Sequence, residues 1–140
     1  MISKDCREAI LADKELERVS ILEGIETVRE ECFSHGSVKA VHISASVQKI
    51  SDGNGYPPNG FAKFGTFHGC KNLRRVTFAE GSQLKEIGWL AFFECKMLQN
   101  IILPESVETL GGYSFYQAGL TEITIPKNTR SIGEYAFYEC

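Results

Sequence analysis

The sequence predicts an α/β repeat solenoid, with short parallel strands on one face and short helical or 3-10 turns on the other. Two observations carry this prediction. An apolar pattern recurs along the chain every 22 to 25 residues, and periods of this length are typical of stacked repeats. Each copy also joins a segment of alternating apolar and polar residues to a glycine and an A-F-x-x-C section, which indicates a strand followed by a tight turn.

The copies are aligned on one phenylalanine, which recurs at the same place: Phe33, Phe67, Phe92, Phe115 and Phe137. Ile10 takes this place in a degenerate first copy, and the last copy is incomplete. Aromatic residues at fixed offsets belong to the core by default, so we expect these rings to form one aromatic column. The whole chain, 1–140, is then a single domain of about five repeats that begin near residue 10.

The N-terminal segment, residues 1–16, predicts a capping helix over Ser3 to Leu16, with Ser3 or Asp5 as its N-cap. Such a helix would shield the first coil, a function that solenoids require. Each later copy carries a strand segment of the form L-x-x-I-x-I, and Pro104 and Pro126 follow it in two copies, where a strand end needs no donor. Glycines such as Gly88 permit a bend, and the A-F-x-x-C section leaves room for about one helical turn.

The residues that flank the middle apolar position of each strand segment point away from the core. They form two columns along the strand face. The first column is Arg18, Ala40, Arg75, Asn100 and Glu122, and the second is Ser20, His42, Thr77, Ile102 and Thr124. Because solenoids commonly bind through such extended surfaces, these columns are candidate binding residues. The alternative is an ordinary solvated sheet.

One insertion, residues 51–65, interrupts the period and is rich in glycine, proline and asparagine. Long loops on rigid scaffolds are common recognition sites, and Tyr56, Phe61 and Phe64 are its candidate aromatic anchors. The alternative, which we favour, is a tolerated insertion whose aromatic residues fold back over the core edge.

Four of the five cysteines have structural positions, and Cys6 lies outside the regular repeats. Cys70, Cys95 and Cys140 lie three residues after the anchor, and Cys32 fills the small-residue place before it, so we expect reduced, packed thiols. Two cysteines and two histidines in adjacent coils raise the alternative of a zinc site: Cys32, His35, His68 and Cys70. The repeat phase turns the cysteines inward and the histidines outward, so they should not converge on one metal. No catalytic set is legible, and we predict no enzyme activity, metal or cofactor.

Bulk properties exclude other classes of partner. The chain has 140 residues, a net charge of −3 and no Lys/Arg block, which disfavours nucleic-acid binding. No apolar run reaches the roughly 18 residues of a membrane helix, so we expect no membrane insertion. The charged N-terminus lacks the apolar region of a signal peptide, so the compartment stays open.

The repeats LQNIILPESVETLGGYSFYQA and LTEITIPKNTRSIGEYAFYEC resemble the BspA-like leucine-rich repeats of bacterial and protozoan surface proteins. The resemblance extends from about Ile10 to the C-terminus. It implies a right-handed superhelix that works in adhesion or protein recognition as a surface antigen. It also implies a host or extracellular-matrix protein as partner, and a cell-surface or secreted location.

We therefore expect a non-enzymatic protein-binding module that presents its strand face. The alternative is a structural or assembly fragment. In that reading, an uncapped C-terminal edge forms a homo-oligomer or continues a longer solenoid, since an open strand edge invites pairing.

Overall fold

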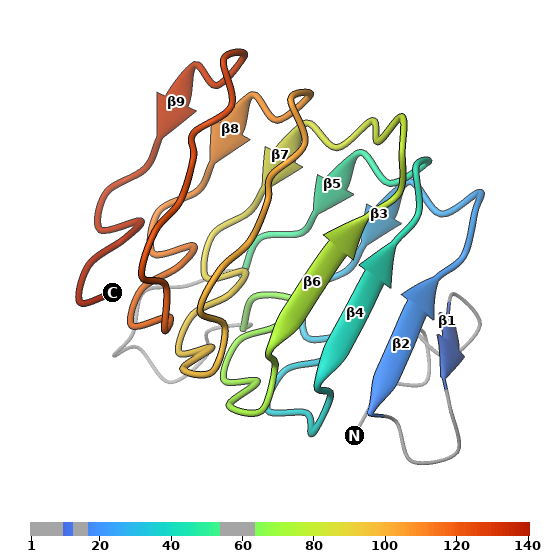
Figure 1. The fold of residues 1–140 in the computed structure, drawn as a ribbon, viewed down its shortest axis with the longest axis horizontal. Helices are drawn as coiled ribbons and strands as arrows, with labels where there is room; N and C mark the ends of the chain where they lie inside the picture. The colour runs from blue at the N-terminus through green and yellow to red at the C-terminus, as the bar shows by residue number, and fades with distance from the viewer. Residues whose placement is uncertain (1–9, 13–16, 54–63) are drawn as a thin grey trace.

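A computed structural model describes residues 10–12, 17–53 and 64–140, which wind into coils stacked side by side (Figure 1). Strands lie on two sides of the stack. The first sheet has the order β1-β2-β4-β6, made of β1 (Ile10–Ala12), β2 (Arg18–Ile21), β4 (Ala40–Ile43) and β6 (Arg75–Phe78). The second has the order β3-β5-β7-β8-β9, made of β3 (Thr27–Val28), β5 (Lys49–Ile50), β7 (Glu86–Ile87), β8 (Thr109–Leu110) and β9 (Ser131–Ile132). Apart from β1, every pairing is parallel, which confirms a repeat solenoid.

The first sheet contains the predicted L-x-x-I-x-I segments, but only of the earlier copies. Val19, Val41 and Val76 lie in register and are buried. The segments 98–103 and 120–125 form no strand, contrary to the expectation that each copy has one. One physical reason is proline. Ala79 donates its N–H to the carbonyl of Ile43 at 2.9 Å, and Pro104 and Pro126 take the equivalent place without a donor.

The second sheet arises where the sequence predicted only a bend. Each of its strands has two residues, too short to show a period in the sequence. Their inward residues Val28, Ile50, Ile87 and Leu110 are buried in register. The glycine that follows is required by close approach between coils, because a Cβ on Gly88 would lie 2.5 Å from the amide nitrogen of Asp52.

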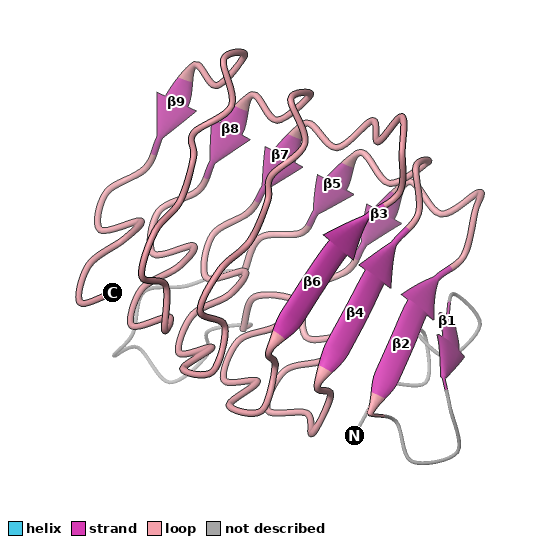
Figure 2. Cartoon of the chain, in the orientation of Figure 1, coloured by secondary structure: helices cyan, strands magenta, loops and turns pink. Residues whose placement is uncertain are grey.

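The expected helical turns on the third side of the stack are wrong, since no residue in the described ranges is helical (Figure 2). Residues with a left-handed backbone conformation lie two positions before and after the anchor, and such residues interrupt an α-helix. Leu90 (φ 58°) and Glu94 (φ 56°) take these positions around Phe92. A ladder between coils replaces helical hydrogen bonds. The N–H of Phe67 donates to Ala91 O at 2.8 Å, and that of Phe92 to Ser114 O at 2.7 Å.

The N-terminal cap also differs from the prediction. Residues 10–12, which lie within the predicted helix, instead form β1, a strand that pairs antiparallel with β2. The rest of the segment 1–16 lies outside the described residues.

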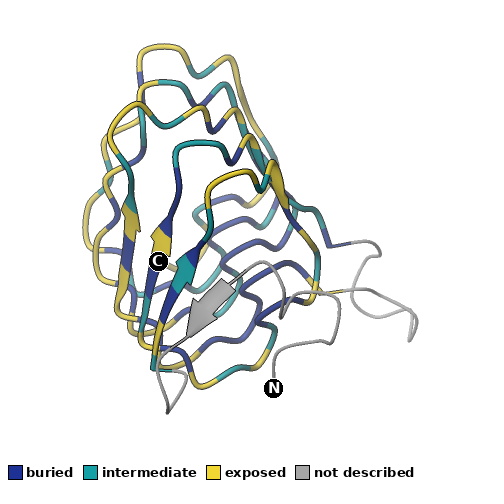
Figure 3. Cartoon of the chain, turned by 90° about the vertical axis from the view of Figure 1, so that its right-hand side faces the viewer, coloured by how far each residue is buried: buried dark blue, intermediate teal, exposed yellow. Residues whose placement is uncertain are grey.

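The anchor phenylalanines form the predicted column through the core. Consecutive rings are stacked with centroids 5.0 to 5.5 Å apart and planes within 7 to 9°. Phe33, Phe67, Phe92 and Phe115 are fully buried, and the buried segments line the inside of the coils (Figure 3). The described part of the chain contains no helix of the length and apolarity needed to cross a membrane.

Candidate functional site

The two predicted columns lie on the outer face of the first sheet and on its continuation over segments 100–103 and 122–125. Eight of the ten side chains are exposed, and Ala40 and Ser20 are half-buried. Strand register places Arg18, Ala40 and Arg75 in one row and Ser20, His42 and Thr77 in the next. His42 Nδ1 and Thr77 Oγ1 share a hydrogen bond of 2.9 Å. We call this surface the strand face.

A groove of about 650 Å³ hollows the strand face between β6 and segment 100–106. It brings together Arg75, Thr77, Asn100 and Ile102 from the predicted columns. The remaining column residues lie outside it. Ile102 is 87% exposed, the highest value among the exposed large hydrophobic residues of the described chain. Val76, Phe78, Leu103 and Pro104 add apolar lining, and Glu105 adds a charge.

The groove lies where the ladder of hydrogen bonds between coils is interrupted. The N–H groups of Lys39, Arg74 and Thr121 each donate to the equivalent residue of the preceding coil, at 2.8 to 3.1 Å. Gln99 is the equivalent residue of the coil after β6, but within the described part of the chain its N–H donates no hydrogen bond to the carbonyl of Arg74. Sequence reasoning missed this break.

Two sequence signals accompany the break. The turn after β6, residues 79–83, is two residues longer than the equivalent turns at 44–46 and 104–106. Pro104 then removes a donor from the next coil. Beside this break Phe78 is only half-buried. Its partner in register on β4, Ile43, is fully buried.

A second aromatic column, also missed, runs along the turn side at the position after each anchor. His68, Phe93, Tyr116 and Tyr138 are stacked with centroids 4.6 to 5.3 Å apart. Because each ring covers the face of its neighbour, the column presents mainly ring edges to solvent. Ring faces, on which ligands stack, are therefore scarce there. The recurrence of an aromatic residue after the anchor was the signal in the sequence.

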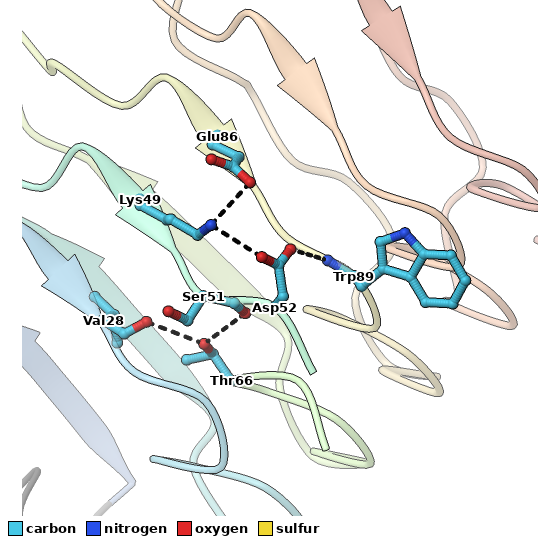
Figure 4. A network of polar contacts seen from close by, with 7 residues as sticks. All are labelled: Val28, Lys49, Ser51, Asp52, Thr66, Glu86 and Trp89. Carbon is cyan, nitrogen blue, oxygen red and sulfur yellow. Dashed lines mark hydrogen bonds and ion pairs between the residues drawn. The ribbon is translucent and has the colours of Figure 1, made fainter. Parts of the chain in front are cut away.

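The start of the insertion is held against the neighbouring coil by a polar network (Figure 4). Lys49 Nζ contacts Asp52 Oδ2 at 2.9 Å and Glu86 Oε1 at 3.0 Å, and these hydrogen bonds raise the pKa of Lys49. Asp52 Oδ1 also accepts the backbone N–H of Trp89 at 2.9 Å. On the other side of the insertion, Thr66 Oγ1 donates to Arg29 O at 3.0 Å.

Of the candidate loop residues, Tyr56 and Phe61 lie outside the described residues. Phe64 is 38% exposed and packs on His68, with ring centroids 4.4 Å apart, and edge-on to His35 at 5.0 Å. This contact agrees with an aromatic residue that folds back on the coil edge.

Cys70 and Cys95 are buried and placed for packing. Cys70 Sγ donates to Phe33 O at 2.9 Å and Cys95 Sγ to Phe67 O at 3.2 Å. Burial raises the pKa of Cys70 to about 12 and that of Cys95 well above its ordinary value, which makes both poor nucleophiles. The expectation of a reduced Cys32 is wrong, because this residue is disulfide-bonded.

The four residues weighed as zinc ligands are not gathered around one point. The rings of His35 and His68 are 5.2 Å apart and pack among aromatic rings. Burial lowers the pKa of His68 to about 4. Within ranges 17–53 and 64–140, no group of three or more His, Cys, Asp or Glu side chains is placed to hold a metal.

Comparison with protein families supplies the identification. The family described as "BspA type Leucine rich repeat region" matches residues 4–54 and 62–140 in six copies. The chain belongs to this family. Membership in the BspA-type family favours protein–protein interaction as the general class of function and does not favour an enzyme. A comparison with curated proteins gave no match.

Two solved structures share the fold of this BspA-type chain. A leucine-rich repeat protein from T. pallidum is 23% identical with a TM-score of 0.68, over 94% of this chain and 64% of that protein. A leucine-rich repeat protein from Bacteroides ovatus is 21% identical with a TM-score of 0.65, over 91% and 36%. The BspA-type chain therefore covers less than two thirds of either relative.

Proposed function

We propose that this chain is a non-enzymatic protein-binding module that holds its partner on the strand face. The groove between β6 and segment 100–106 carries the proposal. It combines apolar lining with Arg75, Asn100 and Glu105, and the exposed Ile102 stands at its side. Apolar anchors surrounded by polar residues are the usual composition of protein-binding surfaces.

The role proposed for this face is adhesion, with a host or extracellular-matrix protein as partner and a cell-surface or secreted location. Two features support it. The chain belongs to the BspA-type repeats, and its exposed columns extend over successive coils, which suits a large partner surface. Cys70, Cys95 and His68 are buried and packed in the core or the second aromatic column, which does not favour a chemical role for them.

Binding of the chain to immobilised fibronectin, laminin, fibrinogen and collagen, measured by surface plasmon resonance, tests the adhesion role. We expect at least one to bind, and Arg75→Glu and Ile102→Glu to weaken that binding about tenfold, because both side chains line the groove. Glu134→Arg is the matched control, since Glu134 is exposed away from the strand face. Equal weakening by Glu134→Arg would locate the binding elsewhere, and no binding to any of the four would remove the adhesion role.

Assembly through the last coil is the second candidate. Its apolar side chains are exposed to an unusual extent: Ile125 38%, Ile132 48%, Tyr135 51% and Tyr138 48%. The half-buried Phe137 stacks on Phe115 in this coil. Exposed apolar surface of this kind is typical of an interface.

Size-exclusion chromatography with light scattering tests self-association through this coil. We expect a dimer at high protein concentration that Ile132→Glu returns to monomer. Arg18→Glu, on the strand face but away from the last coil, should leave the dimer intact. A strict monomer at every concentration rules out the dimer.

A further inference from the structure

We propose that the groove binds an extended peptide segment, which adds to the open edge of β6 as a further strand. The inference rests on the proposed function, because it names the class of partner that the strand face takes. Three observations carry it: the direction of backbone groups in β6, the missing hydrogen bond from Gln99, and the lining of the groove.

The backbone of β6 has one side paired and one side open. Arg75 N–H donates to Lys39 O at 3.2 Å and Ala79 N–H to Ile43 O at 2.9 Å. Arg75 and Ala79 therefore point their backbone N–H and C=O groups toward β4. Successive residues of a strand point their N–H and C=O groups to opposite sides. Val76 and Phe78 consequently direct theirs toward the groove.

The next coil does not pair with those groups. β6 is the last strand of its sheet, and no backbone hydrogen bond joins it to segment 98–103 in the described part of the chain. The two coils instead meet on the other sides of the stack, through the pairing of β5 with β7 and the stacked rings of Phe67 and Phe92. An unpaired row of donors and acceptors at a strand edge recruits another extended backbone.

The side chains around this edge define the peptide. Alternate residues of an added strand point toward the core side, where the half-buried Phe78 and buried Leu103 offer apolar contact. The intervening residues face outward, where Arg75 lies near the start of β6 and Glu105 at the far side of the groove. A peptide with alternating apolar residues, an acidic residue near Arg75 and a basic residue near Glu105 fits both features.

The probe is the fluorescein-labelled peptide EVTITVK, N-acetylated and C-amidated, with binding followed by fluorescence anisotropy. Its apolar residues alternate, and its charges match Arg75 and Glu105 when it runs parallel to β6. We expect binding that the sequences KVTITVK and EVTITVE weaken, because in either strand direction one end of each peptide then meets a like charge. Equal binding of the three sequences would contradict the charge assignment.

N-methylation tests the backbone pairing directly. In an added strand, amides at alternate positions face β6, so N-methylation of one alternating set should weaken binding about fivefold for each lost hydrogen bond. Methylation of the other set should have a smaller effect. Equal effects of both sets, or none, would overturn strand addition.

Four protein variants locate the peptide. Arg75→Glu and Ile102→Glu should weaken peptide binding about tenfold, by charge reversal and by loss of apolar contact respectively. Arg18→Glu and Thr124→Glu are the matched controls, because these exposed residues belong to the same columns but lie outside the groove. Equal loss in a variant and its control would place the peptide elsewhere on the face.

Amide hydrogen exchange measured by NMR provides a readout on the chain itself. The amides of Val76 and Phe78 should exchange faster than that of Thr77, and saturating peptide should slow them. No binding by the probe, nor by a peptide library that keeps its three apolar positions, overturns the inference. If no peptide binds but matrix-protein binding still depends on Arg75, the proposed function stands without the strand-addition proposal. If neither peptides nor matrix proteins bind, both proposals fail.

Discussion

The imidazole of His68 lies parallel to the ring of Phe93, with centroids 4.6 Å apart and ring planes within 1°. The contact buries His68 within the second aromatic column. Its Nδ1 atom has no hydrogen-bond partner among the described residues. Burial, with a smaller contribution from His35, lowers the pKa of His68 from 6.5 to about 4.

This contact predicts a pH-dependent stability. Between the unfolded pKa of 6.5 and the folded pKa of about 4, the unfolded chain binds a proton that the folded chain does not. The free energy of unfolding should therefore fall as the pH decreases from about 6.5 toward 4, and this contribution is fully present above 6.5. Urea unfolding followed by circular dichroism at pH 7.5 and 4.5 measures the difference.

The matched variant is His68→Phe, which keeps an aromatic ring in the column. It should reduce the pH dependence and raise stability at pH 7.5 by about 1 kcal/mol, since it removes an unpaired buried atom. An unchanged difference between the two pH values would show that His68 does not contribute.

The column of anchor rings predicts a graded effect of truncation. Phe92 is fully buried between Phe67 and Phe115, so Phe92→Ala should lower the free energy of unfolding by about 3 to 5 kcal/mol. Phe137 is only half-buried and stacks on Phe115, so Phe137→Ala should have a smaller effect. Denaturant unfolding compares the two, and equal losses would argue against the column as the main source of core stability.

The close approach of coils predicts that Gly65 is irreplaceable. A Cβ there would lie 2.1 Å from Leu90 O, so Gly65→Ala must push two coils apart and should lower the melting temperature strongly. Gly24→Ala is the control, because a Cβ there meets nothing within 4 Å and only its φ of +91° is strained. That strain amounts to about 1 to 2 kcal/mol. Similar losses from both substitutions would contradict the steric argument.

The cysteine environments predict selective alkylation. Cys70 and Cys95 are buried with raised pKa values, so iodoacetamide at pH 8 should leave them unmodified in the folded chain. Cys140 is exposed and should react faster, although partial burial also raises its pKa. Peptide mass spectrometry assigns each site, and denatured protein, in which both core thiols react, is the control.

The core was predictable because it depends on spacing. Leu73 and Leu98 both lie six residues after their anchor phenylalanines, and both are buried. The turn side was not predictable in the same way. Leu90 and Tyr113 adopt φ values of 58° and 54°, which nothing in their residue type favours. Hydrogen bonds between coils impose these conformations, as the N–H of Leu90 donates to Gly112 O at 3.2 Å.

The candidate face was predictable only as two columns. Alternation in a strand fixes which residues point outward, so Arg75, Thr77 and Ile102 could be placed on it. The groove required the structure, because no single copy contains it. It arises between two copies, where the longer turn after β6 and Pro104 meet.

The sequence by itself therefore determined the repeat, the aromatic column and the orientation of each strand residue, since these follow from local periodicity. Only the tertiary structure decided where β6 loses its partner and leaves a groove beside Ile102. The physical reason is that pairing depends on how closely two coils approach, and their backbone separation is set jointly by both coils and the turns that join them.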